Sequence, residues 1–243
     1  MFTLWTIHLS YIVVLQKFSQ DIKPFIADDE LDLWYASWQE NPLRRPEYYN
    51  KTRQQIKEIW EHTREKGTAM HNAIETYING GTLELVDDSI VLSQVQEFFR
   101  RHQAAPQLGE KVCAEKYIFD ERLCLAGAVD LLVRHTDGTL TISDWKRTKG
   151  EMITVGDEKN IPIKQLVNTS YGKYCLQINM YTYILESNYG YKVRDMFVVR
   201  FHDTIGAAQI VTVPRLVNHV AEIVVNRIAQ LETQILELGL DAS

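Results

Sequence analysis

Apolar residues recur at three- and four-residue intervals through the first part of the chain. Between residues 51 and 79 they mark one face of a long helix, or of two consecutive helices, and a pair of glycines ends the run. The same pattern predicts a short helix over residues 29–43. A further helix is expected over residues 89–103, with Asp88 placed to cap its first turn.

The hydrophobic period changes to two after residue 110. Alternating and β-branched runs predict strands over residues 111–119, 123–134 and 139–146. Asp137-Gly138 is a turn sequence, so the last two strands are expected to form a hairpin. The segment that follows, residues 149–171, has no clear pattern and is expected to be a long loop.

The last third of the chain returns to helical spacing and then alternates again. It predicts a helix over 173–190, a strand over 193–202 and a hairpin partner over 208–213. Pro214 then opens an amphipathic helix whose apolar stripe is expected to pack on the domain. The resulting order, α–β–β–β–α–β plus a strand and a helix, predicts an α/β fold with a central mixed β-sheet flanked by helices.

Length and composition add a division of the chain into two parts. The 243 residues, 45% of them hydrophobic and 24% charged, suit one large globular domain with an elaborated end. Residues 1–50 are interpreted as an N-terminal elaboration packed on the core, and residues 51–243 as the main domain with its C-terminal helix. The apolar first 18 residues are too short for a membrane span and have no basic n-region, so we expect an intracellular protein that is neither secreted nor membrane-bound.

The formal net charge of −6 excludes a surface that attracts nucleic acid as a whole. Any DNA or RNA would have to bind at local basic patches. The three cysteines show no CxxC spacing, so neither a disulfide framework nor a zinc ribbon is expected.

Charged residues interrupt the predicted hairpin where a core should be apolar. Asp130 lies in the first strand, and Asp144 and Lys146 end the second. Residues two apart on a strand share a face, so Asp144 and Lys146 point one way and Trp145 the other. Two carboxylates buried close together repel each other unless a cation lies between them. Spacing alone supports a metal site and a structural salt bridge equally.

Other polar residues carry weaker signals. His71 and Glu75 share a helical face, as do Gln177 and Tyr181, because each pair is four residues apart. Such pairs are more often simple helix surface than functional groups. Glu115, in the preceding strand, either adds a carboxylate near the hairpin or faces solvent.

The order of these motifs is more specific than any one of them. A helical histidine is followed by Gly127-x-x-Asp130, then Asp144-x-Lys146, then Gln177-x-x-x-Tyr181. This order resembles the PD-(D/E)XK nuclease superfamily, and within it the RecB-like exonuclease branch, which includes nucleases of large DNA viruses and the mitochondrial genome maintenance exonuclease. The resemblance covers roughly residues 60–202 and implies a restriction-endonuclease-like core.

The resemblance also implies roles for individual residues. It makes Asp130, Asp144 and Lys146 the catalytic residues, with Lys146 orienting or activating the attacking water. The implied ligands of Mg²⁺ or Mn²⁺ are His71, Asp130, Asp144 and the main-chain carbonyl of Trp145. Glu75 and Glu115 would support them. The implied DNA-binding residues are Gln177, Tyr181, Arg147 and Lys149.

The activity implied is metal-assisted hydrolysis of phosphodiester bonds in DNA. The preferred form is an exonuclease that acts on single strands or on the ends of duplex DNA. We expect it to work in replication, recombination or repair, together with proteins of those processes. Many members of the branch carry four cysteines for an iron–sulfur cluster, but Cys113, Cys124 and Cys175 fall inside predicted strands and a helix, so no cluster is expected. An endonuclease with the same site, a hydrolase of RNA or small nucleotides, and a non-catalytic nucleic-acid-binding or scaffold module remain as alternatives.

Overall fold

The computed structural model describes residues 28–41, 43, 45–103, 111–149, 152, 160–167 and 169–237. It divides the chain into two compact units, residues 1–70 and 71–243. The boundary between these units lies inside a helix, and the predicted division at residue 50 stays a prediction. The apolar N-terminal stretch lies outside the described residues, so the packing of residues 1–50 on the core stays a prediction.

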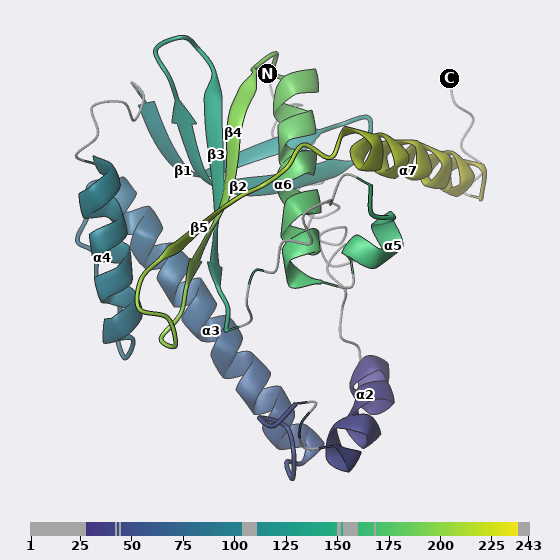
Figure 1. Cartoon of the computed structure of the whole chain (residues 1–243). Coiled ribbons are helices and arrows are strands. Elements are labelled where there is room, and N and C mark those ends of the chain that lie inside the picture. The colour runs from purple at the N-terminus through teal and green to yellow at the C-terminus, as the bar shows by residue number, and fades with distance from the viewer. Residues whose placement is uncertain are drawn as a thin grey trace, which may run out of the picture. The chain divides into compact units, whose positions relative to one another are not determined.

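The first unit contains helix α2 (Asp28–Glu40) and the beginning of α3 (Arg53–Ile78), which is drawn in Figure 1. The segment 51–79 thus forms one long helix. Trp38, Tyr48 and Trp60 form a small aromatic core, in which the Trp38 and Tyr48 ring centroids are 4.9 Å apart. The indole Nε1 of Trp60 donates a hydrogen bond of 2.9 Å to the Tyr48 hydroxyl, which satisfies the polar atom of a partly buried ring.

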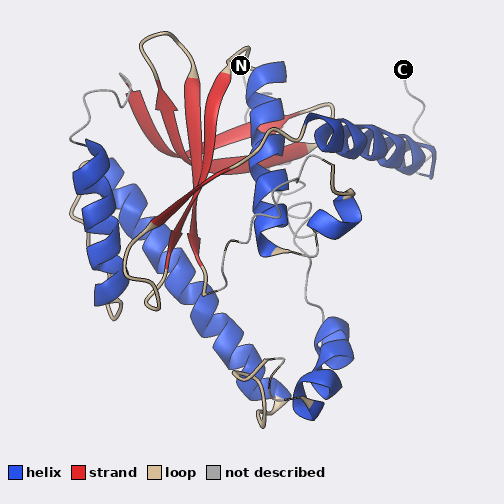
Figure 2. Cartoon of the chain, in the orientation of Figure 1, coloured by secondary structure: helices blue, strands red, loops and turns tan. Residues whose placement is uncertain are grey.

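The second unit is built on a five-stranded sheet in the order β1-β2-β3-β4-β5 (Figure 2). The strands are β1 (Lys111–Asp120), β2 (Leu125–Arg134), β3 (Leu140–Arg147), β4 (Val193–Phe201) and β5 (Gln209–Thr212). Only β3 and β4 pair in parallel, and the other neighbours are antiparallel. The mixed sheet confirms the predicted fold class.

Helices cover both faces of this sheet. The parallel pair β3–β4 needs a crossover connection, which α6 (Ser170–Ser187) supplies after the short helix α5 (Ile163–Leu166). The side chain of Trp145 packs edge-on against Phe98 of α4 (Ser89–Gln103), whereas Lys146, the next residue of β3, reaches Tyr174 of α6. Because successive strand residues point to opposite faces, α4 and α6 lie on opposite sides of β3.

The β2–β3 turn follows its sequence signal. Gly138 adopts φ +81°, and its N–H donates to the His135 carbonyl at 2.9 Å. The Asp137 carboxylate accepts the N–H of Thr139 at 2.9 Å. The left-handed backbone explains the glycine, and the Asp side chain stabilises the turn.

Helix α7 (Val217–Glu237) begins shortly after Pro214 as predicted, but its apolar stripe is only partly buried. Of the stripe residues, Val220 is buried, whereas Ile228 and Ile235 are 42% and 38% exposed. The expectation that the whole stripe packs on the domain is therefore wrong for the second half of the helix. Among the described residues, no helix has the length and apolar character needed to cross a membrane.

Candidate metal centre

Strands β2 and β3 separate at the point where both carry an aspartate. Their ladder runs from Arg134↔Leu140 to Leu131↔Ser143 and stops there, while β3 continues beside β4. Extending the same register places Asp130 opposite Asp144. Asp130 Oδ2 accepts the N–H of Trp145 at 2.7 Å, so a side chain replaces the missing ladder bond. The two carboxylates therefore lie at the fork of the sheet.

Glu115 extends this row onto a third strand. The β1–β2 register pairs Ala114 with Leu131 and Lys116 with Val129, which places Glu115 opposite Asp130. Glu115 itself adopts φ +46°, a conformation that is uncommon for a residue other than glycine inside a strand. Such backbone strain costs about 1–3 kcal/mol and concentrates at functional sites. We name Glu115, Asp130 and Asp144 the carboxylate row.

His71, on α3, lies beside Glu115 and Asp130 of the carboxylate row. Its Nδ1 lies 3.5 Å from Asp130 Oδ2 and 3.7 Å from Glu115 Oε1. Its Nε2 lies 2.9 Å from the carbonyl oxygen of Trp145, which can only accept, so we assign the proton to Nε2. In the neutral ring the lone pair of Nδ1 then faces two carboxylates, and these groups repel one another. Either a proton or a metal cation is needed between Nδ1 and the carboxylate oxygens.

The separations fit a divalent cation. One ligand atom each from His71, Glu115 and Asp130 lies within 4.8 Å of the others. Ligands about 2.1 Å from Mg²⁺ at right angles are about 3 Å apart, so the side chains would have to move closer together to bind the ion. Two carboxylates and one imidazole are a donor set suited to hard or borderline divalent metals.

Asp144 lies beside this trio and has unused bonding capacity. The residue is 2% exposed, and neither of its carboxylate oxygens makes a well-directed hydrogen bond to the described residues. The strong contact is an ion pair, with Lys146 Nζ 2.6 Å from Oδ2. A buried carboxylate with free lone pairs is rare in folded proteins and is suited to binding a cation or a protonated ligand.

The crowding of acids is visible in the pKa values. Burial, and then the charge of Asp144, raise the pKa of Asp130 to about 7. Burial lowers the pKa of His71, but its bond to Glu115 and the charge of Asp130 outweigh burial and raise it. Burial likewise opposes the Lys146 ammonium, yet Asp144 and Asp130 raise its pKa overall. Without a metal, the site gathers protons to balance its negative charge.

Gln177 and Tyr181 lie together on the α6 face, as their spacing predicts. Gln177 Nε2 donates to the Tyr181 hydroxyl at 2.7 Å. The Tyr181 ring lies against Gly127 of β2, where any Cβ would collide with it. The G-x-x-D and Q-x-x-x-Y motifs are therefore in direct contact. Burial raises the pKa of Tyr181 to about 12, so its hydroxyl remains protonated.

Arg147 has a partner other than the phosphate backbone expected for it. Its side chain is 6% exposed, and its Nε and Nη2 both lie 2.8 Å from Asp88 Oδ2, with Asp203 3.5 Å away. The Asp88 carboxylate was expected to cap α4, but it binds Arg147, while the Asp88 carbonyl accepts the N–H of Leu92. This pair joins the end of β3 to the start of α4, so Arg147 is not presented to a ligand.

Two further predicted site residues, Lys149 and Glu75, lie outside the carboxylate row. Lys149 is exposed just past β3 and is accessible to a phosphate. Glu75 lies one turn beyond His71 on α3 and is not part of the metal-ligand trio.

One residue near the site escaped the sequence analysis. The ring of Tyr174 lies 4.9 Å from Lys146 Nζ, on the same α6 face as Gln177 and Tyr181. Its signal was present, because positions i, i+3 and i+7 share a helical face.

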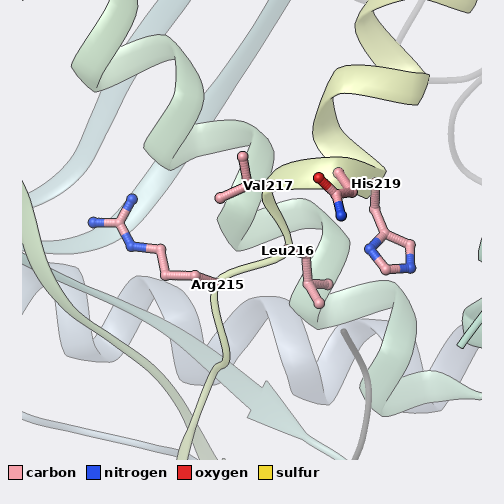
Figure 3. A pocket seen from close by; sticks show the side chains of 5 residues that line it. Arg215, Leu216, Val217 and His219 are labelled. Carbon is pink, nitrogen blue, oxygen red and sulfur yellow. The ribbon is translucent and has the colours of Figure 1, made fainter. Parts of the chain in front are cut away.

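A pocket at the start of α7 lies among other residues (Figure 3). It is lined by Arg215, Leu216, Val217, Asn218 and His219. The Arg215 guanidinium is already held by the Glu186 carboxylate at 3.0 Å. The pocket contains none of the predicted site residues, so the chemistry is assigned to the carboxylate row.

No family model matches the sequence, and no curated protein matches it. Among solved structures, the chain is similar to a "Putative exonuclease" from Eubacterium rectale, at 14% identity and a TM-score of 0.41, over 72% of this chain and 69% of the other. It is also similar to SSO0001, at 10% identity and a TM-score of 0.27, over 65% and 71% of the two chains. Both likenesses are too distant to assign a role to any residue of this chain.

Proposed function

We propose that the protein is a divalent-metal-dependent nuclease that hydrolyses phosphodiester bonds in DNA. The observation that carries the proposal is the carboxylate row, in which Asp130 and Asp144 are buried, with the His71 imidazole and the Lys146 ammonium beside it. Its acids exceed its bases, and part of its bonding capacity is unused. That is the arrangement expected of a site completed by a cation and an anionic substrate.

His71, Glu115 and Asp130 would hold Mg²⁺ or Mn²⁺, with Asp144 as a further ligand through its unused oxygens. The bound cation would supply a strong nucleophile from water near neutral pH and positive charge for the phosphate. This ligand set differs from the one implied by resemblance, because Glu115 joins the trio and the Trp145 carbonyl already contacts His71 Nε2.

Lys146 would act as a positioned positive charge. Asp144 holds its ammonium at 2.6 Å, and the raised pKa keeps that ammonium protonated. A protonated amine can donate hydrogen bonds to a phosphate oxygen and orient the attacking water. Its raised pKa argues against Lys146 removing the proton from water itself.

Gln177 and Tyr181 would position the scissile strand. Both are hydrogen-bond donors, and the Tyr181 hydroxyl remains protonated because its pKa is about 12. Lys149 remains a candidate phosphate contact, whereas the buried Arg147 is withdrawn from that role. Even with few cationic contacts to phosphate, the binding of DNA should depend on the salt concentration and not on the base sequence.

An exonuclease acting on single strands or duplex ends is the preferred form, on the strength of the RecB-like order of motifs. An endonuclease would use the same groups and differ in needing no free end. A non-catalytic scaffold has no need for a strained, unbalanced carboxylate row. A role in replication, recombination or repair, with partner proteins of those processes, follows as part of the proposal.

End-labelled linear and circular DNA, single- and double-stranded, should be incubated with the protein and Mg²⁺, Mn²⁺ or EDTA. We expect metal-dependent loss of linear DNA alone, absent in Lys146→Ala and retained in the control Lys116→Ala, an exposed lysine of β1. Cutting of circles would show an endonuclease. Salt-sensitive binding without cleavage of any substrate would overturn the proposal and support the scaffold.

A further inference from the structure

The Lys146 ammonium is confined on two sides. Asp144 Oδ2 lies 2.6 Å from Nζ, and the Tyr174 ring centroid lies 4.9 Å from the same atom. An ammonium above a ring face is attracted by the ring's quadrupole, and more strongly where water is excluded. The side chain of Lys146 is 19% exposed, so the contact is largely shielded from solvent.

Lysine needs such confinement to act at a defined point. Its four-carbon stem has many rotamers, and Asp144 alone leaves the ammonium free to swing about one carboxylate oxygen. Tyr174 lies within α6, so its ring extends from a regular helix. The ring thus offers a fixed surface opposite the carboxylate.

We propose that Tyr174 is a positioning residue of the nuclease site, which holds the Lys146 ammonium against Asp144 and toward the phosphate to be cleaved. This inference rests on the proposed function. It requires the ring of Tyr174 and not its hydroxyl, and it acts through Lys146 and not through contact with DNA.

The kinetic consequence is a split between kcat and KM. Tyr174→Leu should lower kcat about tenfold and leave KM nearly unchanged, because the ammonium loses its orientation while DNA contacts remain. Tyr174→Phe keeps the ring and should stay within about twofold of the wild type. The matched control Tyr183→Leu, on the same helix but near Arg122, should leave kcat unchanged.

A measurement without DNA separates this inference from the proposed function. In NMR spectra, the Lys146 side-chain methylenes should be shifted upfield by the Tyr174 ring in the wild type and in Tyr174→Phe. They should return toward free-lysine positions in Tyr174→Leu, while Tyr183→Leu leaves them in place.

The two failures are distinguishable. If the wild type cleaves no DNA, the proposed function fails whatever the spectra show. If the wild type cleaves DNA but Tyr174→Leu raises KM with kcat unchanged, Tyr174 contacts substrate directly and the positioning role is overturned. Unshifted Lys146 resonances in a folded, active wild type would overturn it as well.

Discussion

Two neighbouring residues of β3, Lys146 and Arg147, each form an ion pair with an aspartate, yet the two pairs differ in kind. Arg147 binds Asp88 through two nitrogens at 2.8 Å, with both side chains 6% exposed. Lys146 contacts one oxygen of Asp144 and leaves the rest of that buried carboxylate without hydrogen bonds. Among the described residues, Asp88 has no buried oxygen without a hydrogen-bond partner, whereas Asp144 has two and belongs to a group with excess negative charge.

The difference indicates which pair serves stability and which serves chemistry. Two guanidinium nitrogens of Arg147 share one oxygen of Asp88, and these charge-assisted hydrogen bonds fix the geometry of the pair. In the second group, burial and then the charge of Asp144 raise the pKa of Asp130 to about 7, and Glu115 has a strained backbone conformation. A folded protein keeps such costs where a ligand offsets them.

The largest effect is expected from a change at Asp144. Asp144→Asn should lower the DNA cleavage rate by about a thousandfold, because a neutral amide neither binds the cation well nor anchors Lys146. The melting temperature without metal should fall only slightly, because one of several crowded carboxylates is removed and the charge of Asp130 still favours the Lys146 ammonium. Single-turnover cleavage and thermal unfolding measure the two effects, and a variant that still cleaves at the wild-type rate would exclude Asp144 from the site.

Arg147 should give the opposite result. Arg147→Leu should reduce the free energy of unfolding by about 3–5 kcal/mol, because Asp88 is left as an uncompensated buried charge. The cleavage rate per folded molecule should stay close to that of the wild type. Urea unfolding gives the stability. A stable Arg147→Leu protein that no longer binds DNA would restore Arg147 to the phosphate contacts.

The raised pKa of Asp130 predicts a dependence of stability on pH. A carboxyl whose folded pKa lies above its unfolded value stabilises the fold below about pH 4 and loses that contribution as pH rises through about 7. Asp130→Asn lacks this loss, and its amide oxygen can still accept the N–H of Trp145. In EDTA it should therefore exceed the wild type in stability by about 2 kcal/mol at pH 8, and the advantage should shrink as the pH falls and disappear by about pH 4. Equal pH profiles would contradict the assignment.

Glu115 offers the smallest effect and the sharpest contrast. Glu115→Gly should raise the stability of the metal-free protein by about 1 kcal/mol, since glycine adopts φ +46° without strain. Lys116→Gly, one position on in the same strand, should lower stability by a similar amount. Thermal unfolding of both variants in EDTA tests this, and destabilisation by Glu115→Gly would remove the argument from strain.

Much of this fold is predictable because its signals are local. Hydrophobic period and turn residues indicate every described element of the sheet, and period two places Asp144 and Lys146 on one face with Trp145 on the other. The parallel pairing of β3 with β4 follows from the intervening helix. Apolar residues in the second half of α7 are partly exposed although their spacing predicts a buried face. An apolar stripe indicates which residues can be buried, but it does not indicate which element covers them.

The site is predictable only in part because its contacts are not local. The approach of His71 to Asp130 joins residues far apart in sequence, and only the order of motifs suggests it. No local rule indicates that Glu115 takes a left-handed conformation inside a strand. The Arg147–Asp88 pair also joins residues far apart in sequence, so the position of Arg147 just after Asp144-x-Lys146 predicts a DNA contact where the structure has an internal ion pair.

The most direct test of the metal centre is to measure Mn²⁺ binding by isothermal titration calorimetry at pH 7.5. We predict that the wild type and Arg147→Leu bind Mn²⁺ with similar affinity and that both Asp130→Asn and Glu115→Gln bind it at least tenfold more weakly, as expected for the loss of one ligand of a trio. Unchanged affinity in Asp130→Asn and Glu115→Gln would contradict the claim that the carboxylate row is a metal centre.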